Sequence, residues 1–152
     1  MPNRRIEFVV ALITIVAAAA LEELFPPFFG VGFPFLMASV LAVSRRRRFV
    51  AAVFFAVAAG ACEDAVSGLP PFMSVGFFLA LSLIARNLPL PRGLAFLVYP
   101  LYQLYLAVWI SDLNGGIFVR TLFSIPVGAA VIAVSYPVLL WLDRKAGVNE
   151  QE

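Results

Sequence analysis

The sequence contains no histidine, which removes the most common general base and the most common metal ligand of proteins. Motifs for other catalytic chemistry are missing too: there is no Gly-x-Ser-x-Gly turn, no phosphate-binding glycine loop and no Cys-x-x-Cys pair. Cys62 is the only cysteine, so no disulfide can form within the chain. We therefore expect a protein that is not an enzyme and that has no cofactor and no metal site.

Charged residues are also scarce. They make up 13% of the 152 residues, whereas a soluble domain has about 25%. Hydrophobic residues make up 62% of the chain. The net charge of +2 is too small, and the charged residues too scattered, for a surface that binds nucleic acid. This composition predicts an integral membrane protein, and we expect residues 1–152 to form a single membrane domain surrounded by lipid.

Six apolar runs are candidates for membrane-spanning helices, because about 20 apolar residues cross the roughly 30 Å hydrocarbon core. Prolines and glycines crowd the first half of the second run, so its helix should begin near Pro34. The start of the chain also resembles a cleavable secretory signal, but we interpret it as the first span. The predicted fold class is all-α, a polytopic membrane helix bundle with about six transmembrane helices, at residues 6–21, 24–44, 49–64, 72–85, 93–111 and 117–142.

The distribution of Lys and Arg predicts the orientation of these spans, since basic residues concentrate in cytoplasmic loops. With both termini in the cytoplasm, only Arg120 among the basic residues lies outside. The cluster Arg45–Arg48 is sufficient as a cytoplasmic topology anchor, although it could also bind anionic lipid or an acidic partner. The remaining cytoplasmic basic residues are Arg4, Arg5, Arg86, Arg92, Arg144 and Lys145.

Small residues form a stripe on the third predicted helix. Ala52, Ala56 and Gly60 recur every four residues and share one face, which lets two membrane helices approach closely. We therefore predict a helix-packing seam along these positions. Tyr102 and Tyr105 share a face of the fifth predicted helix, where aromatic packing is favoured over a binding role.

The seam ends at a pair of acidic residues, Glu63 and Asp64. Their side chains point about 100° apart on a helix, so they form a poor chelate. Gly68 is expected to end the helix. We predict that Asp64 is partly buried and bonds to Ser67 or to backbone donors near Gly68, while Glu63 faces water. The alternative is that both acids are solvated loop charges.

The pattern Gly60-x-x-x-Asp64-x-x-Ser67-Gly68 resembles the rod shape-determining MreD family of bacteria, as does the terminal stretch IPVGAAVIAVSYPVLLWLDRK, residues 125–145. The family often has a glycine about four residues after Ser-Gly, where this chain has Phe72. The resemblance implies a multi-pass, non-enzymatic protein of the inner membrane that supports side-wall peptidoglycan synthesis. It also implies three partners: an MreC-like scaffold, an MreB-like filament and cell-wall synthases.

An alternative function is the substrate-binding subunit of an energy-coupling-factor vitamin transporter, which has a similar length and helix number. Many such subunits dock through Ala-x-x-x-Ala in the first helix. Here Ala11 is followed at four residues by Ile15, and Ala17 by Leu21, so this spacing is missing. The cell-shape function is therefore favoured over the transporter function.

Overall fold

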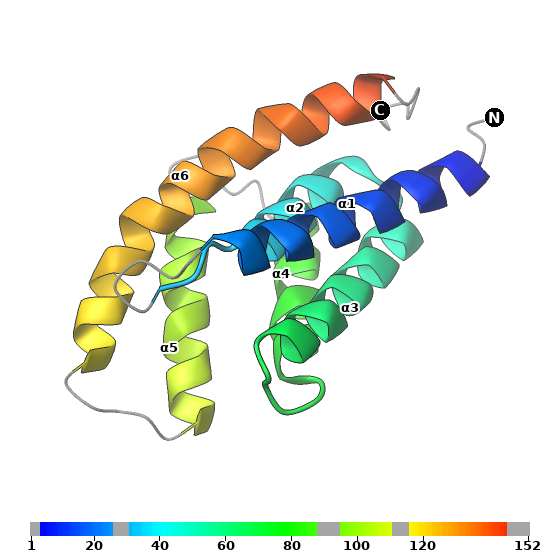
Figure 1. The fold of residues 1–152 in the computed structure, drawn as a ribbon. Coiled ribbons are helices and arrows are strands. Elements are labelled where there is room, and N and C mark those ends of the chain that lie inside the picture. Colours follow the sequence, from blue (N-terminus) through cyan, green and yellow to red (C-terminus); the bar gives the residue numbers. More distant parts are fainter. Residues whose placement is uncertain (1–3, 26–30, 88–94, 111–115, 146–152) are drawn as a thin grey trace.

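The computed structural model describes residues 4–25, 31–87, 95–110 and 116–145 (Figure 1). This part of the chain is helical, with six α-helices and one short 3₁₀ helix, so the predicted all-α class is confirmed for it. The helix bounds are α1 Arg4–Leu24, α2 Phe35–Arg46, α3 Phe49–Val66, α4 Met73–Asn87, η1 Ala95–Leu97, α5 Val98–Ile110 and α6 Gly116–Lys145.

Length and composition together identify the candidate membrane spans, since α1 has 21 residues but carries more charge than α3 with 18. Within the described residues, Phe49–Val66 and Gly116–Leu139 are long and apolar enough to cross a membrane. Helix α2 begins directly after Pro34, as expected, and its 12 residues rise only about 18 Å. The number of helices thus agrees with the prediction, whereas length and composition identify only two of them as candidate spans.

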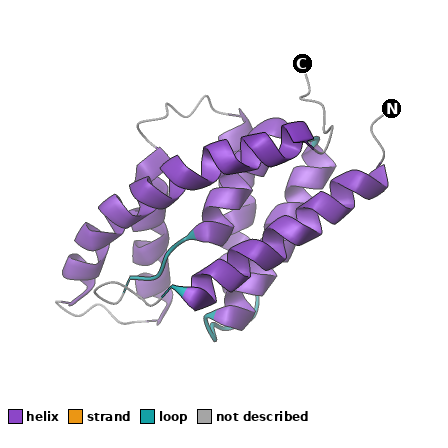
Figure 2. Cartoon of the chain, turned by 45° about the horizontal axis from the view of Figure 1, so that its top comes forward, coloured by secondary structure: helices purple, strands orange, loops and turns teal. Residues whose placement is uncertain are grey.

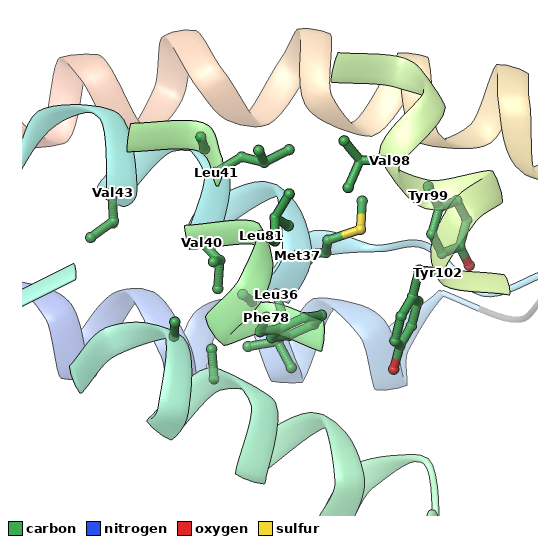
Figure 3. Packing of buried hydrophobic residues seen from close by; sticks show 14 of the residues in the cluster. Leu36, Met37, Val40, Leu41, Val43, Phe78, Leu81, Val98, Tyr99 and Tyr102 are labelled. Atoms are coloured by element: carbon green, nitrogen blue, oxygen red, sulfur yellow. The ribbon is translucent and has the colours of Figure 1, made fainter. Parts of the chain in front are cut away.

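The short α2 helix lies at the centre of the bundle, where it contacts α1, α3, α4 and α6. Every residue from Leu36 to Ser44 is buried. Figure 3 shows α2 side chains packed with those of α4 and α5, including Phe78 and Tyr102. A helix that is apolar on all sides is covered on all sides. Protein neighbours, rather than length, therefore account for the buried position of α2.

Hydrogen bonds between helices define two opposite ends of the bundle. At the end that we call the basic end, Arg47 Nη1 donates to the Glu7 carbonyl of α1 over 3.0 Å, and Arg86 Nη1 of α4 donates to the Arg47 carbonyl over 2.8 Å. The acidic end contains the last turns of α1 and α3 and the first turns of α2 and α4. Figures 1 and 2 both show the start of α1 and the end of α6 on the same side of the molecule.

Candidate functional site

The corner between α3 and α4 contains the residues of the Gly60–Gly68 pattern. Ser67 is the C-cap of α3, and Gly68 follows it with φ of 63°. The Leu69 N–H donates to the Asp64 carbonyl over 3.0 Å, which is the six-to-one bond of a Schellman motif. Gly68 therefore lies where the helix must stop, in the left-handed conformation that glycine adopts without strain.

Asp64 is buried, with 5% of its surface exposed. Its Oδ1 accepts a hydrogen bond of 2.7 Å from the backbone N–H of Ser74, in the first turn of α4. Backbone N–H groups in a first turn have no acceptor within their own helix. The carboxylate at the end of α3 therefore caps the start of α4.

The expected hydrogen bond from Ser67 to Asp64 is not the one that forms. Instead, Ser67 Oγ donates to Glu63 Oε1 over 3.0 Å in an exposed position. Residues four apart lie above one another on a helix, which suits Glu63 and Ser67. Asp64 meanwhile turns toward α4. The observed hydrogen-bond partners thus differ from the predicted Asp64–Ser67 pair. Glu63 bonds to Ser67, and Asp64 bonds to a backbone donor ten residues further along the chain.

The small-residue stripe of α3 is buried at Ala52, Ala56 and Gly60. A Cβ added at Gly60 would lie 2.6 Å from Val75 Cα and 2.7 Å from Val75 N. Backbone atoms cannot move aside as the end of a flexible side chain can. The two helices therefore approach so closely at this point that only glycine fits.

Helix α5 extends the polar contacts of this corner. Ser74 Oγ and Tyr102 Oη lie 2.6 Å apart in a buried hydrogen bond, and Tyr105 Oη donates to the Met73 carbonyl over 3.0 Å. Asp64, Ser74 and Tyr102, which we call the Asp64 cluster, thereby join α3, α4 and α5. Sequence analysis did not identify Ser74 as a site residue. The only local signal was its position just after the prolines that precede α4.

A second carboxylate, Glu22 at the end of α1, caps α2. Its Oε1 accepts a 2.8 Å hydrogen bond from the Leu36 N–H in the first turn of α2, and its carboxyl lies near that of Glu63. Glu63 is half-buried, while its bond to Ser67 lies in an exposed position. Sequence reasoning missed Glu22 because its partners are distant along the chain.

The predicted basic cluster lies at the turn between α2 and α3, and its four residues differ in exposure. Arg45 and Arg46 are half-buried, Arg47 is only 6% exposed, and Arg48 is exposed. Arg47 holds α1 through the Glu7 carbonyl. The guanidinium carbon of Arg86 lies 5.7 Å from the centre of the Phe49 ring. The cluster therefore combines a buried arginine that bonds to another helix with exposed positive charge.

These arrangements organise the ends of helices. Asp64, Ser74 and Tyr102 are buried, and their hydrogen bonds hold the helices together. In the described segments, no group of three or more Cys, Asp or Glu side chains is placed to hold a metal ion. Comparisons of the chain with protein families, with curated proteins and with solved structures find no match.

Proposed function

We propose that the chain is a multi-pass protein of the bacterial inner membrane and a non-enzymatic subunit of the cell-shape complex, with the role of an MreD-type protein. It organises side-wall peptidoglycan synthesis by binding other membrane proteins. Its partners are an MreC-like scaffold, an MreB-like filament and cell-wall synthases.

Exposed apolar surface is the observation that carries this proposal. On α6, Phe118 is 74% exposed, Val134 62% and Trp141 58%. Similar side chains are exposed on α1, including Leu12 and Ile13. Large exposed apolar surfaces are uncommon on soluble monomers. Lipid and partner helices are the environments in which this surface is stable.

The two ends of the bundle support an orientation. The basic end contains Arg45–Arg48 and Arg86, and the acidic end contains Glu22, Glu63 and Asp64. Positive residues concentrate on the cytoplasmic side of membrane proteins. The basic end therefore faces the cytoplasm, where it is available to a filament partner, and the acidic end faces outward.

The structural role of the residues in the α3–α4 corner supports association with other proteins rather than catalysis. The residues Gly60, Asp64, Ser67 and Gly68, which carry the resemblance to the MreD family, build the α3–α4 corner. A rigid corner keeps the outer faces of the helices in a constant arrangement for a partner to recognise. The absence of histidine from the sequence agrees with a role that needs no general base.

Reporter fusions test the orientation. Fusions after Arg48 and after Lys145 should both report the cytoplasm, and a fusion at Asn114 should report the exterior. Opposite compartments for the first two fusions would contradict an even number of spans. A fusion after Asn87, at the end of α4, is an internal control. Arg86 bonds to Arg47, so this fusion should report the same compartment as the fusion after Arg48.

Depletion in the native bacterium tests the cellular role. Rod-shaped cells should become round, and detergent pull-down of the wild-type protein should recover an MreC-like protein. Restoring the wild type should restore rods, whereas Gly60→Leu should not, and Gly76→Ala serves as the matched glycine control. Normal cell shape after depletion, together with saturable binding of a vitamin by the purified protein, would favour the transporter function instead.

A further inference from the structure

The outer face of α3 carries a row of exposed apolar side chains that begins at exposed arginines. Val50 is 76% exposed, Phe54 60% and Val57 38%. These positions recur at four and three residues, so they share one helix face. This face lies away from the seam of Ala52, Ala56 and Gly60, and Figure 1 shows α3 on the outside of the bundle.

Arg48 and Arg86 lie at the basic end of this row. Both residues are exposed. The Arg86 guanidinium rests over the Phe49 ring at 5.7 Å and donates to the Arg47 carbonyl over 2.8 Å, so it is held beside the first turn of α3. Arg48 immediately precedes that turn. A guanidinium has five N–H groups, which leaves Arg86 further donors to offer an anion after its bond to Arg47.

We propose that this face binds one anionic phospholipid, whose phosphate contacts Arg48 and Arg86 and whose acyl chain lies along Val50, Phe54 and Val57. Charge complementarity selects an anionic headgroup, and the arginine fork suits phosphate oxygens. The proposal requires the membrane location proposed above, but it does not depend on a role in cell shape.

The continuity of charge and apolar surface favours a lipid over an acidic protein segment. From Val50 to Val57, α3 rises about 10 Å away from the arginines. A lipid carries its negative charge and its apolar chain in one molecule, in this order. Phe8 of α1 widens the apolar surface, because its ring centre lies 6.2 Å from that of Phe54 and it is 56% exposed. An acidic cytoplasmic segment would engage the arginines without covering Phe54.

Native mass spectrometry of the purified full chain tests the proposal. The chain is placed in micelles with equal amounts of phosphatidylglycerol and phosphatidylcholine that have identical acyl chains. The wild type should retain phosphatidylglycerol preferentially. Arg48→Gln should weaken retention about fivefold and the double variant Arg48→Gln/Arg86→Gln roughly 25-fold, since each arginine contributes a comparable attraction. Arg144→Gln, which removes the same charge from the end of α6, should retain the lipid as the wild type does.

The acyl part is tested by Phe54→Ser, which should weaken retention about threefold through the loss of roughly 30 Å² of apolar contact. Unchanged retention with Phe54→Ser, but loss with Arg48→Gln, would indicate a site for phosphate or for an acidic protein segment and would overturn the proposal. Equal retention of the two lipids by the wild type, or equal losses in Arg48→Gln and Arg144→Gln, would do so as well. If the double variant does not fold, the exposed Arg48→Gln substitution alone decides.

Discussion

The acidic end and the basic end of the bundle both use charged side chains to complete helix termini, yet they differ in burial. At the acidic end, Asp64 is buried and bonds to the start of α4. At the basic end, Arg86 bonds to the carbonyl of Arg47, the C-cap residue that follows α2, while its side chain and that of Arg48 stay exposed. The acidic end therefore contributes mainly to folding, whereas the basic end has charge left for binding.

The sign of the charge at each end agrees with the helix termini that it contacts. The first turn of a helix presents unpaired N–H groups and the last turn unpaired carbonyls. Carboxylates meet first turns at Leu36 and Ser74, and a guanidinium meets the carbonyl of Arg47, the C-cap residue just after α2. The same helix dipoles thus favour negative charge at one end of α2 and α4 and positive charge at the other.

The largest effect is expected at Gly60, where the two helices of the acidic end meet. Gly60→Leu should lower the free energy of unfolding by about 3 kcal/mol or more, because the new side chain overlaps the Val75 backbone. Unfolding in mixed micelles titrated with sodium dodecyl sulfate, followed by circular dichroism, measures this change. At Gly76 the nearest atom to an added Cβ is the Tyr105 hydroxyl at 3.8 Å, so Gly76→Ala should not destabilise. Equal losses at both glycines would contradict the close approach.

Substitutions at Asp64 and Ser67 compare a buried hydrogen bond with an exposed one. Asp64→Leu should cost about 1 to 3 kcal/mol of unfolding free energy, because the Ser74 N–H is left buried without its acceptor. Asp64→Asn keeps an oxygen acceptor and should cost less. Ser67→Ala breaks only the exposed bond to Glu63 and should change stability by less than about 0.5 kcal/mol. A large loss in Ser67→Ala would instead support the Asp64–Ser67 pair, one of the two partners that sequence analysis predicted for Asp64.

Within the basic end, Arg47 and Arg48 offer the same contrast between a buried and an exposed side chain. Arg47→Gln should lower the free energy of unfolding by about 1.5 kcal/mol, since a charged donor to the Glu7 carbonyl is lost from a buried position. Arg48→Gln should leave stability unchanged and weaken lipid retention. The same detergent titration, combined with lipid analysis of each variant, distinguishes the two roles. Equal stability losses would show that burial does not separate these arginines.

A small gain in stability is expected at the turn after α3, where Phe72 has φ of 70° and is 77% exposed. The left-handed conformation costs a non-glycine residue about 1 to 2 kcal/mol, and the greater freedom of glycine in the unfolded chain offsets part of this gain. Phe72→Gly should therefore raise the unfolding free energy by at most about 1 kcal/mol. Gly68→Ala, also at positive φ, should lower it by a similar amount. Destabilisation by Phe72→Gly would mean that the ring makes a contact worth more than the strain.

Much of the helical framework was predictable because its signals are local. The late start of α2 after Pro34 follows from prolines that cannot continue a helix, and the end of α3 follows from Gly68. The stripe of Ala52, Ala56 and Gly60 also indicated a face for close packing. Span lengths were less predictable, because apolar composition does not distinguish a helix buried among other helices, such as α2, from one that faces lipid.

The sequence by itself determined which segments are helical, that α2 begins after Pro34 and α3 ends before Gly68, and how charge is distributed along the chain, since these depend on neighbouring residues. Only the tertiary structure decided that Asp64 bonds to Ser74, that Glu22 reaches both Leu36 and Glu63, and that Arg47 is buried beside Glu7. The physical reason is that an unpaired N–H at a helix terminus can donate to any suitable acceptor, and an unpaired carbonyl can accept from any suitable donor. Which side chain arrives there depends on how helices distant in sequence pack together.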